Sequence, residues 1–141
     1  MIQRIQTFYL LLAFICNGIL PYIFPLWKTM DANGKMAPHY FMQNMEFVFL
    51  LSLSNALILV SILSFKKRMQ QFLLGRINLV INLILLGLFV YQSLTLSGGA
   101  NSAPEKGIGL ILPVFSIVFL VLANKAIKKD DELVKSVDRL R

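Results

Sequence analysis

Four long stretches of this 141-residue chain contain no lysine, arginine, aspartate or glutamate. A helix rises about 1.5 Å per residue, so roughly 20 apolar residues are needed to cross a hydrocarbon core of about 30 Å. No stretch alternates with period two, as the strands of a membrane barrel do. We therefore predict an all-α fold, an integral membrane four-helix bundle that forms a single domain. The predicted transmembrane helices are residues 7–26, 47–65, 77–96 and 108–124, followed by a cytoplasmic tail, residues 125–141.

The composition supports a membrane protein and argues against a nucleic-acid partner. Hydrophobic residues make up 57% of the chain and charged residues 15%, against about 45–50% and about 25% in soluble domains. A soluble protein of this size would have too little polar surface to cover so much apolar material. The net charge is +7, but the basic residues stand in short segments between apolar runs and not on one folded face with interleaved aromatics.

The distribution of charge predicts the orientation. Short loops rich in lysine and arginine stay in the cytoplasm. Most basic residues fall in the segments that would share one side: Arg4, Lys66, Lys67, Arg68, Arg76, Lys125, Lys128, Lys129, Lys135, Arg139 and Arg141. The loops of the other side hold three lysines that three acidic residues balance: Lys28, Lys35 and Lys106 with Asp31, Glu46 and Glu105. We predict that both termini are cytoplasmic.

Neutral polar residues within the second and third spans predict a seam between these two helices. Three serines share one side of the second span: Ser54, Ser61 and Ser64. Asn78 and Asn82 lie four residues apart and so share a face of the third span. In an antiparallel hairpin, residues at equal depth have numbers with a constant sum, which gives two level pairs: Ser64 with Asn78, and Ser61 with Asn82. Ser54 is then expected opposite Gly87 or Leu88.

Two readings of these polar groups remain open. Hydrogen bonds between membrane helices contribute about 0.6 kcal/mol on average, which favours a structural role. The functional alternative is a polar ligand or lipid head group held by Asn78 and Asn82. Asn55 lies on the other face of the second span, where it is expected to meet the first or fourth helix or a partner subunit.

The fourth span and the tail carry two further candidate features. Pro113 lies inside the fourth predicted span, where the missing backbone donor predicts a kink. The tail predicts an amphipathic helix that continues or follows this span, with an apolar face of Leu133, Val134, Val137 and Leu140. Two i,i+4 ion pairs support this helix: Lys128 with Glu132, and Asp131 with Lys135. The apolar face is expected to lie on the anionic inner leaflet, where basic residues are attracted, or to dock onto a partner.

Several kinds of chemistry have no candidate residues. Cys16 is the only cysteine and His39 the only histidine, so a multi-cysteine or histidine metal site is not expected. The spans hold no ionisable Asp, Glu, Lys, Arg or His for a proton relay and no nucleophile–base pair. No glycine-rich phosphate loop is present either. We therefore expect a protein that is not an enzyme, with no catalytic residues, cofactor or metal. The loop of residues 27–45 contains a turn signal at Asp31-Ala32-Asn33-Gly34, and its second half is expected to lie along the membrane surface.

Four segments carry a resemblance to a known family. They are Met1-Ile2-Gln3-Arg4-Ile5-Gln6, then Glu105-Lys106-Gly107-Ile108-Gly109 running into Leu112-Pro113-Val114, then Leu122-Ala123-Asn124-Lys125-Ala126-Ile127-Lys128-Lys129-Asp130, and the ending Ser136-Val137-Asp138-Arg139-Leu140-Arg141. The whole chain resembles a family of small Bacteroidota membrane proteins called domain of unknown function 4293. The resemblance implies a four-helix protein of the inner membrane of a Gram-negative cell, and it supplies no catalytic residues.

Three functions are compatible with these features. The first is a non-enzymatic accessory or scaffold subunit of an inner-membrane complex, with membrane lipids and a protein partner in the membrane or at its cytoplasmic face. The second is a small transporter or channel component that uses the polar residues of the second and third spans. The third is a lipid-binding or sensor membrane protein that acts through the tail.

Overall fold

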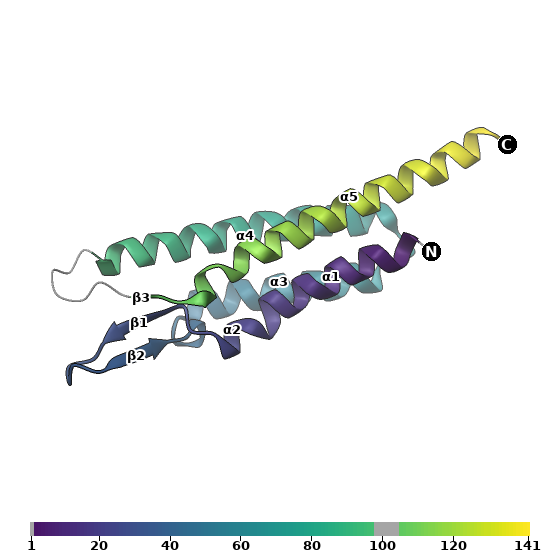
Figure 1. The fold of residues 1–141 in the computed structure, drawn as a ribbon. Helices are drawn as coiled ribbons and strands as arrows, with labels where there is room; N and C mark the ends of the chain where they lie inside the picture. Colours follow the sequence, from purple (N-terminus) through teal and green to yellow (C-terminus); the bar gives the residue numbers. More distant parts are fainter. Residues whose placement is uncertain (1, 98–104) are drawn as a thin grey trace.

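A computed structural model describes residues 2–97 and 105–141, and most of these residues are in helices (Figure 1). The elements are α1 (Ile2–Gly18), α2 (Leu20–Ile23), β1 (Trp27–Met30), β2 (Met36–His39), the 3-10 helix η1 (Phe41–Gln43), α3 (Met45–Leu63), α4 (Arg68–Ser97), β3 (Glu105–Lys106), the 3-10 helix η2 (Ile108–Leu110) and α5 (Leu112–Arg139).

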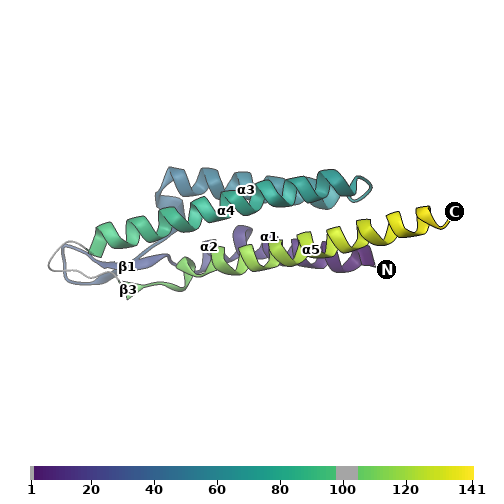
Figure 2. The ribbon, with the colours of Figure 1, turned by 90° about the horizontal axis from the view of Figure 1, so that it is seen from above.

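The four long helices form a bundle of two layers with two helices in each. Seen from above, α3 and α4 make one layer and α1 and α5 the other (Figure 2). Each helix packs against two neighbours: α1 and α4 both contact α3 and α5, so α1 and α4 are diagonal to each other. Both termini lie at one end of the bundle and the strands at the other (Figure 1). We call these the terminal end and the sheet end.

Four helices are long and apolar enough to cross a membrane, as the sequence predicts. They cover Ile5–Ile23, Met45–Leu63, Arg68–Thr95 and Ile108–Arg139. Their outer surfaces carry large apolar side chains such as Phe49, Leu63 and Leu94, each about two-thirds or more exposed. So much exposed apolar surface is stable only against lipid or a partner.

A small sheet caps one end, and the sequence did not predict it. The strand order is β2-β1-β3, with both pairs antiparallel. The predicted turn at residues 31–34 joins β1 to β2, with Gly34 at φ +72°, a conformation that glycine adopts without strain. The second half of the 27–45 loop is therefore strand β2 followed by η1. The all-α prediction holds for the spans but is wrong for this cap.

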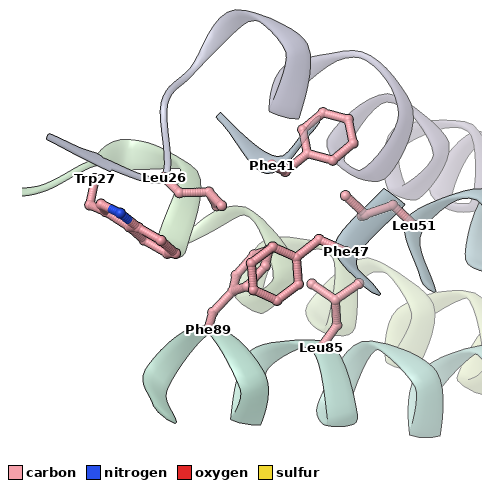
Figure 3. Close-up of a cluster of buried hydrophobic side chains, with 7 residues drawn as sticks. All are labelled: Leu26, Trp27, Phe41, Phe47, Leu51, Leu85 and Phe89. Carbon is pink, nitrogen blue, oxygen red and sulfur yellow. The ribbon is translucent and has the colours of Figure 1, made fainter. Parts of the chain in front are cut away.

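The buried interior contains two apolar clusters. The cluster at the sheet end includes Leu26, Trp27, Phe41, Phe47, Leu51, Leu85 and Phe89 (Figure 3). In it the rings of Phe47 and Phe89 meet edge to face, with centroids 4.5 Å apart. The second cluster is formed by Leu10, Ala13, Ile58, Leu120 and Ala123. On α3, Ser54 falls between a residue of the first cluster, Leu51, and one of the second, Ile58.

Two predictions about the helices are wrong, one of a boundary and one of a kink, and each error has a physical cause. Arg68 and Arg76 were assigned to a loop because they are charged, but α4 begins at Arg68 and includes both. The predicted kink at Pro113 is absent because α5 begins at Leu112, with the proline in its first turn. Backbone N–H groups in the first turn have no intrahelical acceptor, so a proline there removes no hydrogen bond of the helix. The break in the chain falls earlier, between η2 and α5.

Candidate functional site

Four buried polar side chains meet between the two apolar clusters. They are Asn17 of α1, Ser54 of α3, and Asn78 and Asn82 of α4, and each is at most 2% exposed. We call this set the polar layer. The amphipathic spacing of α4 places both asparagines on its inner face, because they lie one helical turn apart. Three helices therefore contribute polar groups to one point of the interior.

The hydroxyl of Ser54 is the centre of the polar layer. Its Oγ donates to Oδ1 of Asn78 at 2.5 Å and accepts from Nδ2 of Asn17 at 2.8 Å and from Nδ2 of Asn82 at 3.0 Å. A hydroxyl has one donor and two acceptor positions, so all three are used. Nδ2 of Asn17 also donates to Oδ1 of Asn82 at 3.0 Å, a contact that links two diagonal helices.

The polar layer has the properties of a structural contact that holds helices together. Its members hold no titratable group, and their side chains hydrogen-bond to one another. Nδ2 of Asn82 is further held by the backbone oxygen of Asn78 at 2.9 Å. One donor, Nδ2 of Asn78, is buried without a hydrogen-bond partner. The arrangement fixes the relative depth of α1, α3 and α4, because a shift of one turn would leave several buried groups unpaired.

The structure brings three of the predicted seam residues together, but in a different register. Ser54, and neither Ser61 nor Ser64, bonds to Asn78 and Asn82. Oγ of Ser61 is buried without a partner, and Ser64 caps the end of α3. The two predicted level pairs, Ser64 with Asn78 and Ser61 with Asn82, are wrong. The reason is that α4 begins at Arg68, so the connection between α3 and α4 is shorter than predicted. With a shorter connection, the residue of α3 at the same depth as Asn78 is near Ser54 and not Ser64.

Asn17 was missed by the sequence analysis. It lies on α1, which was not considered part of the seam because the seam was predicted between the second and third spans. Helix α1 is diagonal to α4 in the bundle. A signal did exist, since Asn17 is the one amide in the first apolar stretch. Asn55, left open between several neighbours, packs against α1: a Cβ atom built on Gly18 would lie 3.1 Å from Nδ2 of Asn55.

The terminal end is held together by polar contacts to α5. Nε of Arg68, at the start of α4, lies 3.0 Å from Oδ2 of Asp130, whose side chain is only 10% exposed. Nε2 of Gln6 donates to the backbone oxygen of Ala126 at 3.2 Å. The sequence analysis noted neither contact, because each joins residues far apart in the chain. Together they fix α5 against α4 and α1 as far as Asp130.

Beyond Asp130 the helix leaves the bundle. None of residues 131–141 is buried, and we call them the projecting segment. The predicted apolar face is exposed on it: Leu133 43%, Val134 39%, Val137 60% and Leu140 89%. The two predicted i,i+4 pairs are confirmed, with Lys135 Nζ 2.6 Å from Asp131 and Lys128 Nζ 3.9 Å from Glu132. The end of α5 extends past the N-terminus (Figure 1).

At the sheet end, a hollow of about 590 Å³ is lined by aromatic and polar side chains. The rings of Trp27 and His39 stack in its wall, with centroids 5.0 Å apart and planes 10° apart. Nδ2 of Asn44 lies 3.4 Å from Nε2 of His39 and donates to Oε1 of Gln92 at 3.3 Å. Burial lowers the pKa of His39, which favours the neutral ring. Across the described residues, no three His, Cys, Asp or Glu side chains gather as metal ligands would.

Comparison with known protein families gives a match that covers nearly the whole chain. The model of the family described as Domain of unknown function (DUF4293) covers residues 2–140, which confirms the resemblance found in the sequence. No curated protein and no solved structure matches the chain.

Proposed function

We propose that this chain, which belongs to the DUF4293 family, is a non-enzymatic accessory or scaffold subunit of a membrane assembly. In this proposal the four spans anchor the protein, and the projecting segment docks onto a helical protein partner. The apolar face of the segment supplies the contact, and the charges around it select the partner.

One observation carries the proposal: α5 is a single unbroken helix from Leu112 to Arg139. Its 28 residues are about 42 Å long, whereas the hydrocarbon core is about 30 Å thick. A helix that crosses the membrane and continues without a bend points away from the surface. The apolar face is thus presented to the aqueous side, where exposed valine and leucine side chains favour a protein contact.

The location of the assembly follows from charge. The basic residues concentrate at the terminal end, as the positive-inside rule requires of the cytoplasmic side. We therefore propose that both termini are cytoplasmic and that the chain is a multi-pass protein of the bacterial inner membrane.

The two alternative functions receive less support. A transporter or channel component would need a path along the polar layer, but these side chains are at most 2% exposed and bond one another. A lipid sensor that acts through the tail would need the apolar face to lie in the plane of the membrane. The direction of α5 does not favour that position unless the helix bends after Asp130.

Site-directed photocrosslinking tests the docking role. A benzoylphenylalanine at Val137 reports what contacts the apolar face in cells, and the same group at Ser136 reports the adjacent polar side. We expect one protein partner, identified by mass spectrometry after purification in mild detergent, to crosslink at position 137 and much less at position 136. The crosslink should be lost when Val134→Asp is added.

The other outcomes would count against the proposal. Crosslinks to lipid alone would favour the membrane-surface role, and crosslinks to a second copy would favour self-association. Equal crosslinking from positions 136 and 137 would mean that the apolar face is not the contact.

A further inference from the structure

A groove with basic walls lies between α4 and α5 near the terminal end. It consists of two adjoining hollows of about 220 and 560 Å³ that share Phe72, Arg76 and Lys128 in their walls. The two helices are close together at Gly75, where a Cβ atom would lie 2.1 Å from Oδ1 of Asn124. We call the two hollows together the basic groove.

The basic groove has an excess of positive charge that the described residues do not neutralise. Four cationic side chains line it: Arg68, Arg76, Lys125 and Lys128. Arg68 is paired with Asp130, and Lys128 with Glu132 at 3.9 Å. Asp131, the acidic residue of the wall, is paired with Lys135 at 2.6 Å. Among the described residues, Arg76 and Lys125 have no carboxylate within the 4.0 Å of an ion pair.

The guanidinium of Arg76 is held in place without such a partner. Its Cζ lies 4.5 Å from the centroid of the Phe72 ring, a cation–π contact. The contact leaves the N–H groups at the edge of the guanidinium available for an anion. Planar guanidinium groups bind phosphate oxygens through two donors at once.

The wall changes character toward the middle of the spans. One turn from Arg76 on α4 is Val80, and one turn from Lys125 on α5 is Val121. These valines are 53% and 47% exposed, and Leu79 lies beside them in the wall. A cationic rim is therefore followed by an apolar trough at hydrocarbon depth. The same order of polarity occurs along a phospholipid, from phosphate to acyl chain.

We infer that the basic groove binds one anionic glycerophospholipid of the leaflet at the terminal end. Arg76 and Lys125 contact the phosphate, and an acyl chain lies along Val80 and Val121. An acidic peptide or a free phosphate would use the rim but leave the apolar trough empty. The inference does not rest on the docking role, since it uses no residue of the apolar face.

Native mass spectrometry of the full chain in mild detergent tests this site. The probes are phosphatidylglycerol and phosphatidylcholine with identical acyl chains. We expect phosphatidylglycerol to bind more tightly with one molecule per chain. The double variant Arg76→Gln/Lys125→Gln should weaken its binding about 30-fold, because each basic residue near an anionic head group contributes about a fivefold factor.

A matched control separates a built site from diffuse charge. Lys66→Gln/Lys129→Gln removes the same two charges near the terminal end, outside the groove, and should weaken binding less than about threefold. If the double variant does not fold, Lys125→Gln alone should weaken binding about fivefold, since this side chain is exposed and makes no ion pair with a described residue.

Three results would overturn the inference. They are equal losses in the two double variants, equal binding of the two lipids, and displacement of phosphatidylglycerol by millimolar glycerol 3-phosphate. The last result would mean that a soluble phosphate compound is the occupant.

Discussion

The polar layer and the projecting segment are opposites in how they use their side chains. In the polar layer, four polar groups lie inside an apolar bundle and bond one another. In the projecting segment, four large apolar groups lie outside with no contact in the described structure that buries them. Both regions depart from the usual distribution, with polar groups inside or apolar groups outside. The buried polar groups find hydrogen-bond partners within the chain, whereas the exposed apolar groups are not covered by any described residue.

This difference separates stability from function. Changes in the polar layer should alter the free energy of unfolding and leave the surface of the protein intact. Changes in the projecting segment should leave stability nearly unchanged and alter what the protein binds. Variants that fail to follow this division would break the comparison.

The largest effect is expected at the centre of the polar layer. Ser54→Ala removes three hydrogen bonds and leaves buried amides unpaired, and should lower the free energy of unfolding by about 2–3 kcal/mol. Ser52→Ala is the control, because this exposed hydroxyl bonds only to the backbone oxygen of Val48 at 2.6 Å. Reversible unfolding by steric trapping in bicelles measures both. Equal effects would show that the polar layer is not a special contact.

Two glycines of α4 test whether packing inside the bundle, and not the change of residue itself, decides stability. Gly75→Ala places a methyl group against Asn124 and should destabilise the bundle by about 2 kcal/mol. Gly87→Ala meets nothing within 4 Å and should stabilise it by about 0.5–1 kcal/mol, through higher helix propensity. The same unfolding measurement checks the two signs. A stabilising Gly75→Ala would mean that α4 and α5 are not in close contact there.

A smaller effect is expected where the two regions meet. Asp130→Asn removes the charge that pairs with the partly exposed Arg68 and should cost about 1 kcal/mol. Asp131→Asn breaks a surface pair with Lys135 and should cost about 0.3–0.5 kcal/mol. Hydrogen exchange of residues 126–132 gives a local readout, and faster exchange is expected only for Asp130→Asn. If Asp131→Asn loosens these residues as much, Asp130 is not the point where α5 is fixed.

The smallest effect on stability is expected in the projecting segment. Val137→Asp should change the free energy of unfolding by less than about 0.5 kcal/mol, because the side chain is 60% exposed. The same variant should nevertheless abolish the partner crosslink of the apolar face, measured from position 134. A large loss of stability would mean that the segment packs on the bundle after all.

The spans could be predicted from the sequence because their length and lack of charge are local properties. Pairing between distant segments could not be read in this way. Strand β1 has only four residues, and its second neighbour, β3, comes from residues 105–106. The stacking of Trp27 on His39 follows from this sheet and was equally hidden.

The polar layer could be predicted in part. Asn78 and Asn82 were identified by their one-turn spacing, and Ser54 by its face of α3. The register was wrong because charge at Arg68 and Arg76 was taken as the mark of a loop, whereas arginine is a good helix former. Long basic side chains also reach the membrane interface from within a helix. Asn17 could have been noted as a polar residue of the first span, but its contact with Asn82 depends on which helices are diagonal, which no local pattern contains.

The direction of the projecting segment relative to the membrane tests the central claim most directly. A nitroxide placed at position 137 and, separately, at position 136 of the chain with Cys16→Ser, reconstituted without partners, reports contact with water or lipid by power saturation. We predict that both positions are accessible to a water-soluble nickel complex and neither to oxygen dissolved in the hydrocarbon. Burial of position 137 in lipid with position 136 in water would contradict the account, because the apolar face would then lie on the membrane.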